Sequence, residues 1–246
     1  MLAVRIIPTL LKRGDSLVKG QRFNAWRSVG HVEQAARIYQ AREVDELCIL
    51  DIAATPEGKG PDLAAIERLT EQCFMPITVG GGVRTLEDVR ALLRAGADKV
   101  AICTAAIENP PLIPACRDHF GSQAIVAAID VHKWTAAKVC AKYRTDIPAV
   151  RFAMQCALHG AGEILLTSID REGTMQGYDL DLIKAVSEAV DVPVIANGGC
   201  GLYEHMVEAV KAGASAVAAG AMFQFTEQTP AGAARYLAQH GIEART

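Results

Sequence analysis

Short apolar runs, rich in β-branched residues, alternate with longer amphipathic runs along the whole chain. The apolar runs predict eight buried strands, at residues 4–11, 46–52, 76–80, 99–103, 124–130, 163–169, 193–197 and 216–220. Between them, residues 62–73 and 86–96 carry apolar side chains at helical spacing, and Gly96 stands where a helix commonly ends. Eight strands, each followed by a helix, indicate one closed parallel (β/α)₈ TIM barrel over residues 1–246. An open, doubly wound sheet is the main alternative for such alternation.

A gap-free internal repeat favours the barrel over the open sheet. A shift of 117 residues aligns the segment from Glu46 to Thr104 with the segment from Glu163 to Ala221. The aligned pairs are Asp62 with Asp179, Pro76 with Pro193, Gly81-Gly82 with Gly198-Gly199, and Gly96 with Gly213. Two four-strand halves, at about residues 1–120 and 121–246, predict a barrel with a pseudo-twofold axis. The first and fifth strands are offset by 119 residues, which sets Leu11 opposite Asp130 at the C-terminal mouth of the barrel.

Two glycine-rich turns follow mated strands at the predicted mouth. "VGGGVRT" comes after the third strand and "ANGGCG" after the seventh. Glycine lets backbone N–H groups approach an anion closely, and a helix N-terminus just beyond the turn favours negative charge. A symmetric pair of such turns predicts a ligand with a phosphate, or another anionic group, at each end. The alternative is that these glycines only make tight strand-to-helix turns.

The amino-acid composition limits the classes of partner and of chemistry that we expect for this protein. The 246 residues are 50% hydrophobic and 22% charged with a net charge of −3 and no long basic run, which argues against nucleic acid or an anionic membrane as partner. No apolar run reaches the roughly 18 residues of a spanning helix, and no signal-peptide pattern opens the chain. Seven cysteines without a CxxC pair predict a reducing cytoplasm, and six scattered histidines predict no metal site. We expect no cofactor.

Several motifs carry a specific resemblance. They are "RIIP" at 5–8, "LVKG" at 17–20, "LDI" at 50–52, "VGGG" at 79–82, "AGADKV" at 95–100, "FGSQ" at 120–123, "AID" at 128–130 and "GAGEILLTSIDREGT" at 160–174. On these the chain resembles the HisF family, the cyclase subunits of imidazole glycerol phosphate synthase, along nearly its whole length. The resemblance implies a (β/α)₈ subunit that receives ammonia from a HisH-like glutaminase in a heterodimer. At the barrel mouth, an aspartate on each of strands 1 and 5 would act as acid and base on a substrate with two phosphates.

The resemblance also assigns site residues. Phosphate binding falls on Gly82, Cys103, Thr104, Glu172, Gly173, Gly199, Gly220 and Ala221. The substrate pocket takes Leu11, Lys19, Asp51, Thr167, Asp170 and Asn197 around the catalytic Asp130. Arg5, Glu46, Lys99 and Glu163, each near the start of a strand, match the family's ammonia gate, and Asp98 lies on the face where the glutaminase docks. A salt-bridge ring that merely plugs the barrel is the alternative for the gate, because buried charges must pair.

Three departures from the family's pattern lie on the substrate side. Leu11 replaces the aspartate of strand 1, and a leucine cannot transfer a proton at any pH. Asp130 then has no second ionisable residue to share the roles of acid and base. The alternative interpretation of Asp130 is a structural carboxylate that caps the loop after its strand. Residues 131–148 are shorter than the family's glycine-rich hairpin loop, and Cys103 stands where asparagine is common, which we interpret as a packing residue.

These departures favour a paralogue as the main hypothesis. The chain is similar to HisF-like proteins of the WbuZ type, which are linked to amidation of surface-polysaccharide sugars. That resemblance implies a HisH-like glutaminase and a third, ligase-like amidotransferase as partners. One alternative is the cyclase of histidine biosynthesis, with Asp51 or Asp170 in place of the missing acid. Another is a non-catalytic subunit that activates a glutaminase and passes ammonia onward.

Overall fold

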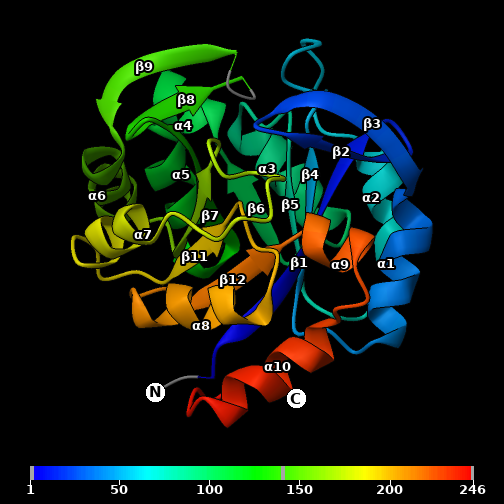
Figure 1. Cartoon of the computed structure of the whole chain (residues 1–246). Helices are drawn as coiled ribbons and strands as arrows, with labels where there is room; N and C mark the ends of the chain where they lie inside the picture. The colour runs from blue at the N-terminus through cyan, green and yellow to red at the C-terminus, as the bar shows by residue number, and fades with distance from the viewer. Residues whose placement is uncertain (1–2, 140–141, 245–246) are drawn as a thin grey trace.

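Eight parallel strands close into a barrel surrounded by helices in the computed structural model, which describes residues 3–139 and 142–244 (Figure 1). The neighbours around the barrel run β1-β4-β5-β6-β7-β10-β11-β12, and β12 pairs with β1 again. The closed (β/α)₈ prediction is confirmed, and the open sheet is excluded because every barrel strand has two parallel neighbours. Within the described residues no helix has the length and hydrophobicity to cross a membrane.

The barrel strands coincide closely with the predicted apolar runs. They are β1 (Arg5–Arg13), β4 (Leu47–Asp51), β5 (Ile77–Gly80), β6 (Lys99–Ile102), β7 (Ile125–His132), β10 (Glu163–Ser168), β11 (Val194–Asn197) and β12 (Ala216–Ala219). Their apolar residues are buried on both faces, as parallel strands covered by helices require.

The helices between the strands begin and end at recognisable signals. The long ones are α1 (Val32–Ala41), α2 (Leu63–Thr70), α3 (Leu86–Arg94), α5 (Leu112–Phe120), α6 (Ala149–His159), α7 (Leu180–Ser187), α8 (Tyr203–Lys211) and α10 (Pro230–Gln239); α4 (Thr104–Glu108), η1 (Ser122–Ala124) and α9 (Ala221–Phe225) are short. A capping box of Thr85 with Asp88 starts α3, and Gly96 at φ +101° follows its end.

Two antiparallel hairpins extend the barrel at its C-terminal end. β2 (Ser16–Gln21) and β3 (Asn24–His31) follow β1, and β8 (Thr135–Lys138) and β9 (Tyr143–Pro148) follow β7. Residues 131–148, read from sequence as a shortened loop, therefore form most of a hairpin; residues 140–141 lie outside the described part. Because β1 and β7 are repeat mates, the two hairpins lie at related places around the mouth.

Residues aligned by the repeat occupy matching positions. The Asp62 carboxylate accepts the Ala65 N–H at 3.2 Å, and its mate Asp179 accepts the Leu182 N–H at 3.2 Å. A Cβ atom at Gly82 would lie 2.7 Å from the backbone of Gly60, and one at Gly199 would lie 2.2 Å from the backbone of Gly177. Residues related by the 117-residue shift therefore share structural contacts as well as residue identities.

The apolar interior has two parts. The larger lies between the barrel and its helices and holds most of the buried leucine, isoleucine and valine side chains. The smaller fills the inside of the barrel with Ile7, Cys48, Ala101, Val126, Ala128, Leu165, Ile195, Ala216 and Ala218. This inner part, rich in alanine, separates the two ends of the barrel, where the candidate site residues lie.

Candidate active site

A pocket of about 800 Å³, partly open to solvent, lies at the C-terminal end of the barrel. It receives residues from seven barrel strands or the turns after them and from the β2–β3 hairpin. They are Thr9, Leu11, Lys19, Phe23, Trp26, Leu50, Asp51, Ile52, Thr55, Gly80, Gly81, Ala101, Cys103, Thr104, Ala128, Asp130, Leu165, Thr167, Glu172 and Asn197. Its mainly apolar lining with a few converging polar groups is typical of a small-molecule site.

Leu11 and Asp130 face this one pocket, as the repeat predicts. Leu11 is 6% exposed and pairs with Leu50 on β4 and Val18 on β2. Burial raises the pKa of Asp130 to about 7; the charge of Glu172 also raises it, and a hydrogen bond from Cys103 lowers it. A carboxyl group that titrates near neutral pH can donate or accept a proton during a reaction.

Lys19 and Glu172 form a buried charged pair on another side of the pocket. The Lys19 ammonium lies 4.0 Å from the Glu172 carboxylate, and both side chains are largely buried. Burial lowers the pKa of Lys19, and the Glu172 charge partly offsets that effect. A Cβ atom at Gly220 would lie 2.0 Å from Lys19 Nζ and 2.9 Å from Thr9 O, so the ammonium packs directly against the turn after β12. An anion at that turn would meet a cation.

Two further pairs hold polar groups at the pocket wall. Asn197 Nδ2 donates to Thr167 Oγ1 at 3.0 Å, and both side chains are buried. Asp51 Oδ1 accepts the N–H groups of Ala53 and Ala54 at 2.9 and 3.1 Å. Its Oδ2 lies 3.5 Å from the ammonium of Lys12, so this carboxylate is largely occupied by its own turn.

The residues assigned to phosphate binding divide into two groups. Cys103, Thr104 and Glu172 line the pocket, whereas Gly82, Gly173, Gly199 and Gly220 in the surrounding turns, and Ala221 at the start of α9, do not line it directly. The first four of these five have no room for a Cβ atom, and all but Gly220 have positive φ. Steric limits and backbone conformation therefore favour glycine at these positions independently of any role in anion binding.

Asp170 lies apart from the pocket lining. His132 Nδ1 lies 2.9 Å from its Oδ1, and the Lys133 N–H donates to its Oδ2 at 2.9 Å. These contacts hold the carboxylate at the end of β7, and Asp170 is not among the residues that line the pocket. The proposal that Asp170 replaces the missing strand 1 acid therefore has no support in the geometry.

The aromatic wall of the pocket was not predicted from the sequence. Phe23 and Trp26 come from the β2–β3 hairpin, and the Arg22 N–H donates to Glu172 O at 2.9 Å, which fastens the hairpin beside the pocket. The run "FNAW", two residues after "LVKG", is the signal that could have located this wall, since aromatic residues in a polar segment need an apolar surface to cover.

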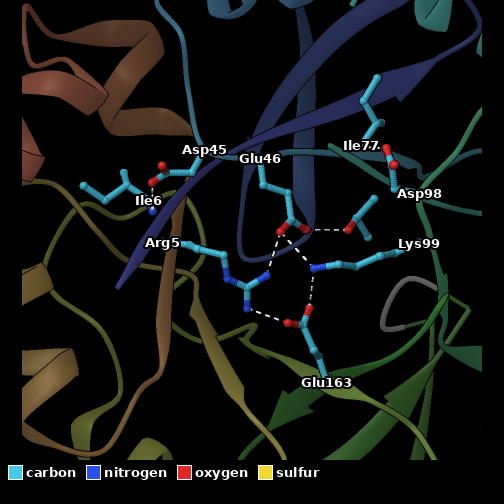
Figure 2. A network of polar contacts seen from close by, with 9 residues as sticks. Arg5, Ile6, Asp45, Glu46, Ile77, Asp98, Lys99 and Glu163 are labelled. Atoms are coloured by element: carbon cyan, nitrogen blue, oxygen red, sulfur yellow. Dashed lines mark hydrogen bonds and ion pairs between the residues drawn. The ribbon is translucent and has the colours of Figure 1, made fainter. Parts of the chain in front are cut away.

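Four charged residues form a closed ring at the opposite, N-terminal end of the barrel (Figure 2). Arg5 contacts Glu46 at 2.7 Å and Glu163 at 2.5 Å, and Lys99 contacts the same glutamates at 2.9 and 2.8 Å. Thr78 Oγ1 donates to Glu46 at 2.6 Å. Burial alone would lower the pKa of Arg5, but the two glutamates outweigh it and raise that pKa. The charge ring, Arg5–Glu46–Lys99–Glu163, is thus electrically balanced.

Asp98 lies beside this ring on the N-terminal face. Its residue is exposed, yet its Oδ2 accepts the Ile77 N–H at 2.8 Å, as Asp45 accepts the Ile6 N–H at 3.0 Å (Figure 2). Both carboxylates satisfy backbone donors where barrel strands begin. Asp98 therefore has a structural contact that is compatible with an exposed interface position.

Across residues 3–139 and 142–244, no three His, Cys, Asp or Glu side chains gather in a way that could hold a metal ion.

Comparison with known proteins gives two findings. Residues 5–229 match a family model described as "Histidine biosynthesis protein". The chain is also 49% identical, over 251 residues and the full length of both proteins, to a protein of Hyphomonas neptunium named "Imidazole glycerol phosphate synthase subunit HisF". Neither finding distinguishes a WbuZ-type subgroup.

Proposed function

The chain belongs to the histidine biosynthesis protein family, and we propose that it is the cyclase-type subunit of an imidazole glycerol phosphate synthase. The observation that carries the proposal is the 49% identity to a HisF subunit over the full length of both chains. Both comparisons name histidine biosynthesis or its synthase, so they favour that alternative over the sugar-amidation hypothesis formed from Leu11 and the shortened hairpin.

The pocket supplies the groups that such a reaction needs. Asp130, with its pKa near 7, is the proton-transfer residue, and the buried ammonium of Lys19 beside Gly220 attracts one anionic end of the substrate. The mated turns at Gly82 and Gly199 bind the two phosphates through backbone N–H groups. The aromatic hairpin wall excludes water from the reacting atoms.

Leu11 sets the expected rate of the reaction. It faces Asp130 across the pocket but cannot exchange a proton, so one ionisable group stands where the resemblance implies two. General acid–base steps typically contribute about 10²–10⁴-fold, and we expect cyclisation slower than in a two-aspartate enzyme by a factor in this range.

Ammonia for the reaction comes from a separate glutaminase bound at the N-terminal face. In this proposal the charge ring is the entry point, and neutral ammonia passes from it through the alanine-rich interior to the mouth pocket. Support comes from the placement of the ring at one end of the barrel axis and Asp130 at the other. Asp98 and its exposed surroundings form part of the glutaminase contact.

Two measurements test the function. The purified chain, given ammonium and the two-phosphate substrate of the synthase, should form imidazole product slowly; Asp130→Asn should abolish it. Expression in a histidine auxotroph that lacks its HisF should restore growth. Absence of product at high enzyme concentration together with no growth would overturn the proposal, and the sugar-amidation alternative, which Leu11 favours, would then be examined with a sugar precursor.

A further inference from the structure

The thiol of Cys103 contacts the carboxyl group of Asp130 inside the mouth pocket. Cys103 follows β6 and Asp130 lies on the adjacent β7, and the distance from Sγ to Asp130 Oδ2 is 3.5 Å, within hydrogen-bonding range for sulfur. Both residues line the pocket. From the sequence, Cys103 was assigned to a phosphate site and its side chain was interpreted as a packing residue; the structure adds this contact with Asp130.

The two oxygens of Asp130 have different surroundings. Oδ2 accepts the hydrogen bond from the thiol, whereas no group in the described part of the chain donates to Oδ1. Asp130 remains partly exposed, and the space that it faces is the pocket. One oxygen is thus held by the protein and the other is open to a bound molecule.

Resting on the function proposed above, we infer that Cys103 is the positioning residue of Asp130. Its thiol holds Oδ2 and presents Oδ1 to the substrate. The thiol stays protonated throughout, and the proton that moves goes between the substrate and Oδ1, so no thiolate, oxidant or further reactant is needed. With Leu11 on the far wall, this neighbouring thiol takes the place of a second polar partner in orienting the carboxyl group.

The other charged groups around Asp130 do not supply this contact. From the loop after β10, Glu172 acts on Asp130 through its negative charge, and Lys19 of the hairpin lies beside Glu172. Asp51, after β4, lines the same pocket but accepts from its own turn. Cys103 is thus the neighbour that stabilises the charged form of Asp130 by a hydrogen bond, which opposes the effects of burial and of Glu172.

The test measures the ionisation of Asp130 directly. An infrared pH titration of its carboxyl group, taken as the difference between the wild type and Asp130→Asn, should show a midpoint near 7. In Cys103→Ala the midpoint should rise by roughly 0.5–1 pH unit, because a donor to the carboxylate is lost. Cys103→Ser keeps a donor and should keep the midpoint. Cys116→Ala, which removes a buried thiol on α5 that does not line the pocket, is the control for thiol loss.

Kinetics with ammonium then link the contact to the reaction. The acidic limb of the pH profile of kcat/KM should shift upward in Cys103→Ala by the same amount as the infrared midpoint, kcat should fall, and Cys103→Ser should restore both. An unchanged infrared midpoint in Cys103→Ala overturns the inference, as does an infrared shift without a kinetic one. If the wild type forms no product and does not restore growth of the auxotroph, the proposed function fails, and the infrared comparison alone decides whether the thiol holds the carboxyl group.

Discussion

Replacing Lys99 with methionine removes one of the two cations of the charge ring and leaves Glu46 and Glu163 facing Arg5 alone. The Lys99 ammonium contacts the two glutamates at 2.9 and 2.8 Å, and the side chains of Lys99, Glu46 and Glu163 are 18%, 3% and 14% exposed. Removing one partner of a buried ion pair costs about 3–5 kcal/mol, whereas exposed pairs contribute about 0–1 kcal/mol. For these partly screened pairs we expect a loss of about 2–3 kcal/mol in the free energy of unfolding.

A double-variant cycle separates charge imbalance from lost packing. Glu163→Gln alone leaves the ring with one excess positive charge, and combined with Lys99→Met it leaves Arg5 and Glu46 as a balanced pair. Because the second substitution removes the charge that the first left unpaired, the double variant should be more stable than the sum of the single losses predicts, by at least about 1 kcal/mol. Urea unfolding followed by circular dichroism gives all four free energies.

A surface lysine provides the matched control. Lys184 on α7 lies 4.0 Å from Glu188, which directly follows that helix, with side chains 65% and 67% exposed, so Lys184→Met should change stability by less than about 0.5 kcal/mol. For the ring variant, the loss corresponds to a fall in Tm of roughly 4–12 °C in a chain of this size. Additive losses in the cycle, or a Lys99→Met variant as stable as the Lys184→Met control, would refute the argument that the ring is a coupled network.

Three further predictions concern the mouth. Leu11→Asp should fold normally and raise the ammonium-dependent rate roughly tenfold or more, because a second carboxylate then faces Asp130; a lower rate or an unfolded variant would count against the site. Burial raises the pKa of Asp130 in the folded protein, so folding opposes ionisation of this carboxyl group, and the wild type loses stability as pH rises from about 4 to about 7. Asn has no such group, so the free energy of unfolding of Asp130→Asn should exceed that of the wild type by on the order of 2–4 kcal/mol above pH 7. A pH-independent difference in urea unfolding would contradict this. Calorimetric titration with phosphate should detect two sites, and Gly82→Ala and Gly199→Ala should each remove one; loss of both sites, or of neither, would contradict the pairing of the turns.

The barrel could be predicted because its signals are local and repeated. Strands buried on both faces appear as continuous apolar runs, and Gly96 marks a helix end that its positive φ explains. The hairpins could not be read in the same way. β3 (Asn24–His31) is mostly exposed and polar, and its pairing with β2 contains two register shifts, so no alternation of side chains marks it.

The site was predictable only as far as strand position determines it. The repeat offset brings Leu11 and Asp130 to one pocket, and the charges at strand starts do meet in a ring. The direction of a side chain in a turn is a different matter. Asp170 follows a barrel strand but turns to His132, and the contact of Cys103 with Asp130 depends on rotamers that no spacing encodes.

The charge ring is not divided evenly between the two halves of the repeat. Arg5, Glu46 and Lys99 come from the first half and carry one net positive charge, while Glu163 from the second half carries one negative charge. The repeat mates of the two cations are Ala124 and Ala216. Two copies of the first half would bring two excess positive charges to the barrel axis, and two copies of the second would bring two negative ones. The charges of the ring therefore balance only when the two unlike halves combine. This balance favours the joining of the two halves over the pairing of either half with its own copy.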